Sequence, residues 1–125
     1  MKRLVNVALL GFAMAVAAIS NAAPFDARAF EAAQTAGKPV LVEVHADWCP
    51  TCAKQKPIIG ELMSRQNMKK YAVFTVDFDT QKDLLKRFGA QQQSTLIVFK
   101  GKQEVGRSTG ETDKQKIAAL LEKAL

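Results

Sequence analysis

A chain of 125 residues with 48% hydrophobic side chains is long enough for one domain with a hydrophobic core and too short for two ordinary domains. Its net charge of +6 includes Lys2 and Arg3, and the charge of +4 that remains without them is modest. No dense basic run with interleaved aromatic residues predicts a nucleic-acid surface. The chain contains only two cysteines, Cys49 and Cys52, so any sulfur chemistry takes place there.

The first segment is typical of a secretory signal peptide. Lys2 and Arg3 precede an uncharged run from Leu4 to Ile19, and small residues in a cleavage pattern follow it. The run is rich in alanine and weakly hydrophobic for a permanent membrane span, which is the competing interpretation. We therefore expect a signal peptide over residues 1–22, export to a periplasm, and one domain over residues 23–125.

The first half of the domain predicts a helix, a strand and a second helix. Asp26 can cap a helix through about Ala36, which the following glycine and proline stop. The run from Val40 to Val44 is too continuously apolar for a half-exposed strand, so we expect a central strand covered on both faces. Glu43 is the ionisable exception in that strand. The next helix contains Pro57, expected to kink it, and apolar residues at helical spacing: Ile58, Ile59, Leu62 and Met63.

The second half predicts a strand, a helix, a hairpin and a last helix. Tyr71 to Phe78 indicates a second buried strand, and Lys82 to Phe88 a short helix. Thr95 to Phe99 and Glu104 to Thr109 flank a glycine-containing turn that suits a hairpin. Thr112 is expected to cap a helix whose apolar face consists of Ile117, Leu120, Leu121 and Leu125. This order predicts an α/β sandwich, with a mixed sheet and helices on both faces.

The cysteine pair, in Cys49-Pro50-Thr51-Cys52, falls where the central strand gives way to a helix N-terminus. Unpaired N–H groups and the helix dipole favour a thiolate there, so Cys49 is the expected nucleophile. A structural disulfide across so short a loop would remove little unfolded-chain entropy. A zinc site usually needs four ligands, and His45 is the only histidine. The pattern favours redox chemistry, with a metal site or a structural bridge as alternatives.

Several sequence features outside the cysteine pair resemble those of a known protein family. Leu41 to Cys49 resembles the strand and tryptophan that precede the active cysteine of thioredoxin-fold proteins, and Pro57 falls where that family kinks its helix. Phe88-Gly89 resembles a helix ending of the family, and other positions resemble its hairpin glycines: Gly101, Gly106 and Gly110. The chain from about Lys38 to Leu125 thus resembles a compact thioredoxin-like three-layer sandwich. Its Trp-Cys-Pro-Thr-Cys string is also similar to exported thioredoxin-like reductants of cytochrome c maturation, without their inserted segments.

The resemblance implies roles for three residues. Cys49, ionised and accessible, attacks a partner's disulfide, and Cys52 then attacks Cys49 to release the reduced partner. Glu43 matches the family's buried carboxylate near the second cysteine, where a raised pKa would suit it to accept the proton of Cys52. The intervening Pro50-Thr51 carries no charge or imidazole that would stabilise a thiolate further, so we expect a reductant.

The resemblance also implies a substrate surface formed by Trp48, Pro50, Ser94 and Thr95. Ser94 departs from the family, which places a cis-proline there. A cis bond before a non-proline residue costs roughly 2.5–4 kcal/mol, so we expect a trans bond, with the hydroxyl and N–H of Ser94 offered to the substrate. The alternative is a tolerated, solvent-facing loop residue. His45 stands where relatives often have an aromatic residue and is expected to pack or to reach solvent rather than catalyse.

The expected partners are protein disulfide or dithiol substrates, together with a membrane-linked or other thioredoxin-like electron partner. No cofactor, resident metal or nucleic acid is expected, and the protein is expected to be a monomer. Two other functions stay open. One is a soft-metal module that binds Cu(I) through Cys49 and Cys52, with or without His45. The other is a redox-inert interaction domain whose disulfide merely persists.

Overall fold

The computed structural model describes residue 11 and residues 25–125. The expected signal peptide lies outside the described residues except for residue 11, so its existence stays a prediction. No helix in the described part of the chain is long and apolar enough to cross a membrane.

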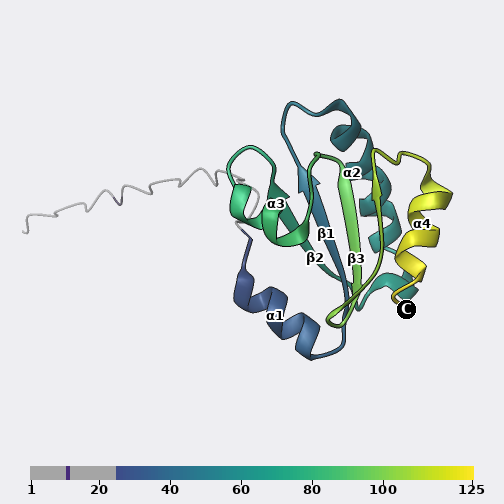
Figure 1. Ribbon diagram of the computed structural model, residues 1–125. Coiled ribbons are helices and arrows are strands. Elements are labelled where there is room, and N and C mark those ends of the chain that lie inside the picture. Colours follow the sequence, from purple (N-terminus) through teal and green to yellow (C-terminus); the bar gives the residue numbers. More distant parts are fainter. Residues whose placement is uncertain (1–10, 12–24) are drawn as a thin grey trace, which may run out of the picture.

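A four-stranded mixed sheet forms the middle layer (Figure 1). Its strands are β1 (Pro39–His45), β2 (Ala72–Asp77), β3 (Thr95–Lys100) and β4 (Gln103–Thr109), in the spatial order β2-β1-β3-β4. β1 pairs with β2 in parallel and with β3 antiparallel, and β3 and β4 form the predicted antiparallel hairpin. The predicted mixed sheet is therefore confirmed, with β1 in its interior.

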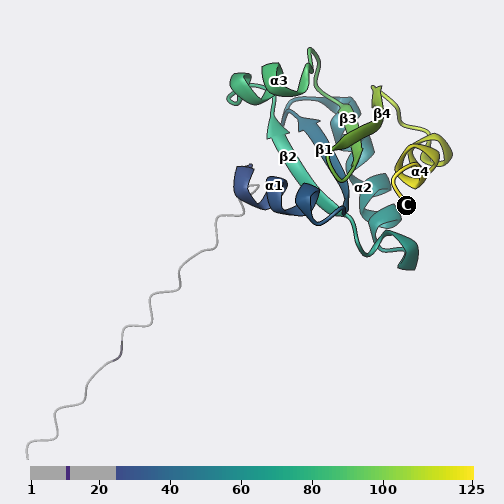
Figure 2. The same cartoon turned by 60° about the horizontal axis from the view of Figure 1, so that its bottom comes forward.

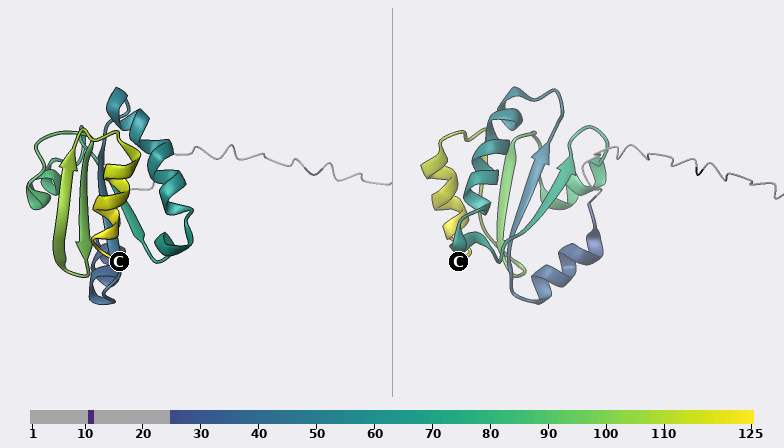
Figure 3. Two further views of the ribbon diagram at one scale, coloured as in Figure 1. Left: turned by 90° about the vertical axis from the view of Figure 1, so that its right-hand side faces the viewer. Right: turned by 180° about the vertical axis from the view of Figure 1, so that it is seen from behind.

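Helices cover both faces of the sheet, as Figures 2 and 3 show. The helices α1 (Ala27–Thr35) and α3 (Lys82–Phe88) cover one face, and α2 (Pro50–Met63) and α4 (Lys114–Glu122) cover the other. This arrangement confirms the three-layer sandwich.

Side chains of β1 alternate between two hydrophobic clusters because successive residues of a strand point to opposite faces. Val40, Val42 and Val44 belong to the cluster under α1 and α3. Leu41 belongs to the cluster under α2 and α4. Glu43 shares the parity of Leu41, so the fold directs this carboxylate to the face that α2 covers.

The strand β2 differs from its prediction. It is an edge strand, with Val76 buried but Val73 42% exposed. The prediction of a second strand buried throughout is therefore wrong. Periodicity reports how apolar a segment is, whereas burial also depends on whether a neighbouring strand covers its outer side.

The start and end of α4 also differ from their predictions. The cap is Asp113 rather than Thr112, since the Asp113 carboxylate accepts the N–H of Lys116 at 2.9 Å. Leu125 lies beyond the helix and is 46% exposed, so it does not extend the apolar face. The other expected helix positions hold: Asp26 caps α1, Pro57 lies inside α2, and Gly89 ends α3 with a φ of 61°.

Candidate active site

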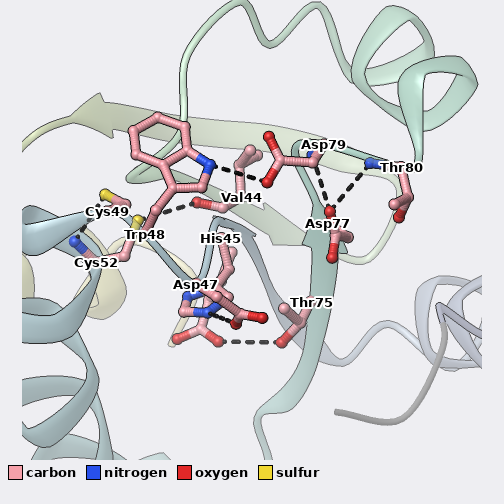
Figure 4. Close-up of polar contacts among 11 residues, drawn as sticks. Val44, His45, Asp47, Trp48, Cys49, Cys52, Thr75, Asp77, Asp79 and Thr80 are labelled. Atoms are coloured by element: carbon pink, nitrogen blue, oxygen red, sulfur yellow. Dashed lines mark hydrogen bonds and ion pairs between the residues drawn. The ribbon is translucent and has the colours of Figure 1, made fainter. Parts of the chain in front are cut away.

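Cys49 is the N-cap residue of α2, as the sequence predicted (Figure 4). The Cys49 amide donates to the carbonyl of Ala46 at 3.1 Å, which closes the short turn after β1. Pro50 occupies the first turn of the helix, where its missing N–H costs nothing. The Cys49 Sγ accepts the N–H of Cys52 at 3.1 Å. A free N–H group of the first helical turn therefore points at this sulfur and favours negative charge on it.

The two sulfurs are more enclosed than the sequence suggested. Both cysteines are free thiols, Cys49 is 2% exposed and Cys52 is 4% exposed. They pack with Ala46 and Phe78 in a small apolar cluster. The expectation of an accessible Cys49 is therefore wrong for this conformation, because a disulfide can reach the sulfur only if its surroundings move.

Trp48 is the exposed part of the site. Its side chain is 59% exposed, and its Nε1 donates to the Asp79 carboxylate at 2.9 Å (Figure 4). Its ring centroid lies 6.5 Å from that of Phe78. Pro50 is also exposed. The Asp79 contact could not be predicted from local sequence, because the two residues are 31 positions apart. The structure thus places an exposed indole, fixed at one end, beside a covered sulfur.

Cys52 faces the interior of the domain. Its Sγ lies 3.9 Å from the Val44 carbonyl of β1. Burial is the main cause that raises the pKa of Cys52, and a hydrogen bond with Cys49 adds to it. The thiol form is therefore favoured at Cys52.

A cavity of about 190 Å³ opens beside Cys52. Residues of β1, α2 and β2 line it: Glu43, Val44, His45, Cys52, Gln55, Lys56, Ile59 and Thr75. Burial raises the pKa of Glu43, while the Thr75 hydroxyl, 3.4 Å from the carboxylate, and the charges of His45 and Lys56 act in the opposite direction. The fold thus brings the predicted carboxylate and the predicted second cysteine to one cavity.

His45 lies at the outer side of this cavity. Its side chain is 32% exposed, and its Nε2 is 3.0 Å from the Asp47 carboxylate (Figure 4). That position fits the prediction of a partly solvent-exposed residue. In the part of the chain that the structure describes, no group of three or more His, Cys, Asp and Glu side chains is arranged to hold a metal ion.

Ser94 and Thr95 are buried, with 5% and 3% exposure. No described peptide bond is cis, and Ser94 adopts a φ of 57°. Its N–H donates to the Val44 carbonyl at 2.8 Å, and its hydroxyl donates to the Gln93 carbonyl at 2.6 Å. The Thr95 hydroxyl donates to the Gln92 carbonyl at 2.8 Å. Both the solvent-facing alternative and the offer of free Ser94 donors to a substrate are therefore wrong for this conformation.

Gln55 is a site residue that the sequence interpretation missed. It is 4% exposed, and its Nε2 donates to the carbonyls of Ser94 at 3.2 Å and Glu111 at 2.9 Å. The available signal was its spacing, because Gln55 shares one helical face with the buried residues Cys52, Ile59 and Leu62. A polar residue on that face predicts a buried hydrogen-bond partner.

Comparisons with known proteins agree with this geometry. The thioredoxin family model matches residues 21–123. A thioredoxin from Synechocystis sp. is 34% identical over 87 residues, which cover 70% of this chain and 80% of that protein. A bifunctional thioredoxin reductase/thioredoxin from Mycobacterium leprae is 35% identical over 96 residues, which are 77% of this chain but only 20% of that protein.

Solved structures give the same result. The crystal structure of Trxlp from Edwardsiella tarda has a TM-score of 0.76 and 45% identity, with 78% of this chain and 95% of that chain covered. The chain belongs to the thioredoxin family, and it is a thiol-disulfide oxidoreductase.

Proposed function

We propose that this protein is an exported reductant that transfers electrons from the Cys49–Cys52 dithiol to disulfides of periplasmic proteins. The observation that carries the proposal is the contact of the Cys52 N–H with the Cys49 Sγ at the start of α2. This contact favours a thiolate at the first cysteine, and thiolates are the nucleophiles of disulfide exchange.

The reaction has two exchange steps. The Cys49 thiolate forms a bond to one sulfur of the partner's disulfide, the partner's S–S bond breaks, and the departing thiolate takes a proton from solvent. Cys52 then loses its proton, bonds to the Cys49 Sγ and displaces the partner's second sulfur as a thiolate. The partner gains two electrons, and this protein ends with a Cys49–Cys52 disulfide.

Glu43 is the proposed acceptor of the Cys52 proton. It lines the same cavity as Cys52, and burial raises the pKa of its carboxyl group. A carboxylate with a raised pKa is a stronger base than an exposed one, which matches it better to a thiol. The cavity has room for a water molecule to carry the proton between the two groups.

Substrate recognition is proposed for the exposed surface around Cys49. Trp48 and Pro50 offer contacts to an extended chain. Ser94 and Thr95 are buried and act by holding the neighbouring loop in place through their hydrogen bonds. Cys49 is covered in the dithiol form, so a substrate gains access by displacing Trp48 from its contacts with Asp79 and Phe78.

The direction of electron flow and the location rest on separate arguments. Pro50 and Thr51 carry no charge that would stabilise a thiolate at either cysteine, and burial disfavours ionisation of Cys52. Strong stabilisation of the thiolate makes a pair oxidising, and between the two cysteines this chain adds no charged group to the single N–H contact at Cys49, which supports a reductant. The leader-like residues 1–22 support export, and a pair that cycles in an oxidising compartment needs a membrane-linked or thioredoxin-like electron donor.

A partner trap tests the proposal directly. In cells that express the full chain with Cys52→Ser, we expect periplasmic proteins to accumulate as mixed disulfides with Cys49. The matched control, Cys49→Ser, should trap none. Adducts confined to the cytoplasm, or equal adducts with both variants, would contradict the proposal. Equilibration of the purified protein with a defined thiol buffer then gives the potential, and a potential as oxidising as that of a dedicated disulfide donor would contradict the reductant role.

A further inference from the structure

The Ser94 peptide group is held from three directions. Its N–H donates to the Val44 carbonyl at 2.8 Å, and its carbonyl accepts the N–H of Gly110 at 3.0 Å and the Gln55 Nε2 at 3.2 Å. Ser94 also adopts a φ of 57°, which a residue with a side chain adopts only when neighbouring contacts hold it. These contacts therefore place the Ser94 N–H next to the Val44 carbonyl in the dithiol form.

The Cys52 thiol approaches the same carbonyl. Its Sγ lies 3.9 Å from the Val44 oxygen that accepts the Ser94 N–H. A thiol can donate to that oxygen, but a thiolate cannot, and its charge is repelled by the carbonyl. Burial raises the pKa of Cys52, whereas the backbone amides of Ala46 and Ser94 act in the opposite direction. When Cys52 ionises, its hydrogen bond to the Val44 oxygen is lost. The Ser94 N–H, which points at the same oxygen, can then donate a hydrogen bond to the Cys52 thiolate instead.

We propose that the backbone N–H of Ser94 is a catalytic donor, which moves from the Val44 carbonyl towards the Cys52 Sγ when that sulfur ionises. The inference rests on the proposed function, in which Cys52 is the second nucleophile. Cys52 gives its proton to Glu43, the Ser94 N–H stabilises the resulting thiolate, and the thiolate bonds to Cys49 as the bond from Cys49 to the partner's sulfur breaks.

Gln55 is the positioning residue of this arrangement. Both hydrogens of its amide are engaged, one on the Ser94 carbonyl and one on the Glu111 carbonyl. Gln55 lies one turn after Cys52 on the same face of α2, so it ties the loop that carries the donor to the helix that carries the sulfur.

Other groups around Cys52 titrate or carry charge, and their influence on the Cys52 titration has to be separated from that of the Ser94 N–H. Cys49 lies at the helix start, Glu43 and His45 lie on β1, and Lys56 lies on α2. The neighbouring strand β2 contributes Thr75 to the cavity, and the loop over residues 89–94 contains no charged side chain. Replacing Cys49 leaves Cys52 as the only thiol of the chain.

The decisive measurement follows the Ser94 amide proton by NMR in the full-length Cys49→Ser protein while Cys52 is titrated. We expect the Ser94 amide signal to move downfield with the same midpoint as the Cys52 thiol. The Gly101 amide is the control, because it donates to the Lys38 carbonyl at 2.9 Å in a distant turn, and its signal should not move with Cys52. A Ser94 signal that stays constant through the Cys52 midpoint would overturn the proposal.

Substitutions in the same background provide a second readout. Ser94→Ala and Ser94→Gly keep the N–H and should leave the Cys52 midpoint unchanged. Ser94→Pro removes the N–H and should raise the midpoint of the Cys52 titration. Each pH unit by which the midpoint rises lowers the thiolate fraction of Cys52 about tenfold at a pH below the midpoint. Gln55→Leu should raise the midpoint by less, since the N–H stays but its tether is lost.

Equal midpoints in folded Ser94→Pro and Ser94→Ala proteins would overturn the inference. Proline cannot adopt a φ of 57°, so the Ser94→Pro protein has to be checked for folding by circular dichroism. If that variant does not fold, the NMR titration of the Ser94 amide tests the proposal by itself. Failure of the periplasmic trap would reject the proposed function without altering these titrations.

Discussion

Cys49 and Cys52 are separated by two residues, yet the fold gives their sulfurs opposite environments. Cys49 caps α2 and accepts an N–H from the first helical turn, next to the exposed Trp48. Cys52 lies one turn further, against a backbone carbonyl and a cavity that contains Glu43. One turn of helix therefore separates a sulfur that accepts a helix-start N–H from a sulfur that lies against a carbonyl and whose pKa is raised by burial.

The largest expected effect comes from removing either sulfur. Cys49→Ser should abolish disulfide reduction, because the hydroxyl cannot attack a disulfide. Cys52→Ser should also abolish turnover but leave the first step intact, so one equivalent of a disulfide substrate should be captured. Mass spectrometry of the adduct and an insulin reduction assay distinguish the two variants. Turnover by Cys49→Ser would reverse the assigned order of the sulfurs.

The next largest effect is expected from Glu43→Gln. Loss of a positioned base should slow the release of the partner by about 100-fold near neutral pH, the lower end of the range for general base catalysis. Stopped-flow measurement of the second exchange step tests this, with Glu122→Gln on the exposed side of α4 as the control. Equal rates for Glu43→Gln and the unsubstituted protein would show that Cys52 loses its proton by another route.

Glu43 should also affect stability, in a direction that follows from its pKa. Because burial raises the pKa of Glu43 in the folded state, its contribution is favourable at acidic pH and is lost as pH rises through the folded-state value. Glu43→Gln should therefore raise the melting temperature at pH 7 to 8, and this gain should shrink as pH falls towards 4. Thermal unfolding across this range measures it. A gain that is constant with pH would indicate that Glu43 is not desolvated.

The smallest expected effect concerns access to Cys49. Asp79→Asn weakens the charge-assisted hydrogen bond that holds the Trp48 indole, so Cys49 should react severalfold faster with iodoacetamide. Asp83→Asn, at an exposed position in the first turn of α3, controls for the change in charge. Unchanged reactivity in the Asp79→Asn protein would mean that Trp48 does not cover the sulfur.

Local sequence predicted much of this fold because the relevant signals are local. The apolar run from Val40 to Val44 identified the interior strand, and Asp26 and Gly89 marked helix ends through their own side chain or backbone. The predictions failed where burial depends on a neighbour. Val73 is exposed because β2 lies at the edge, and Leu125 is exposed because α4 has already ended.

For the site, the sequence by itself determined the pair of cysteines, their place at a helix start and an ionisable residue in the adjacent strand. These follow from spacing, since three residues span one helical turn and alternate residues of a strand share a face. Only the tertiary structure decided that Cys49 is buried and that the Ser94 N–H donates to the Val44 carbonyl. It also decided that Gln55 connects the loop that contains Ser94 to the loop that contains Glu111. The hydrogen bonds of Gln55 join residues 39 and 56 positions apart, and their geometry is set by how the layers pack rather than by the local chain.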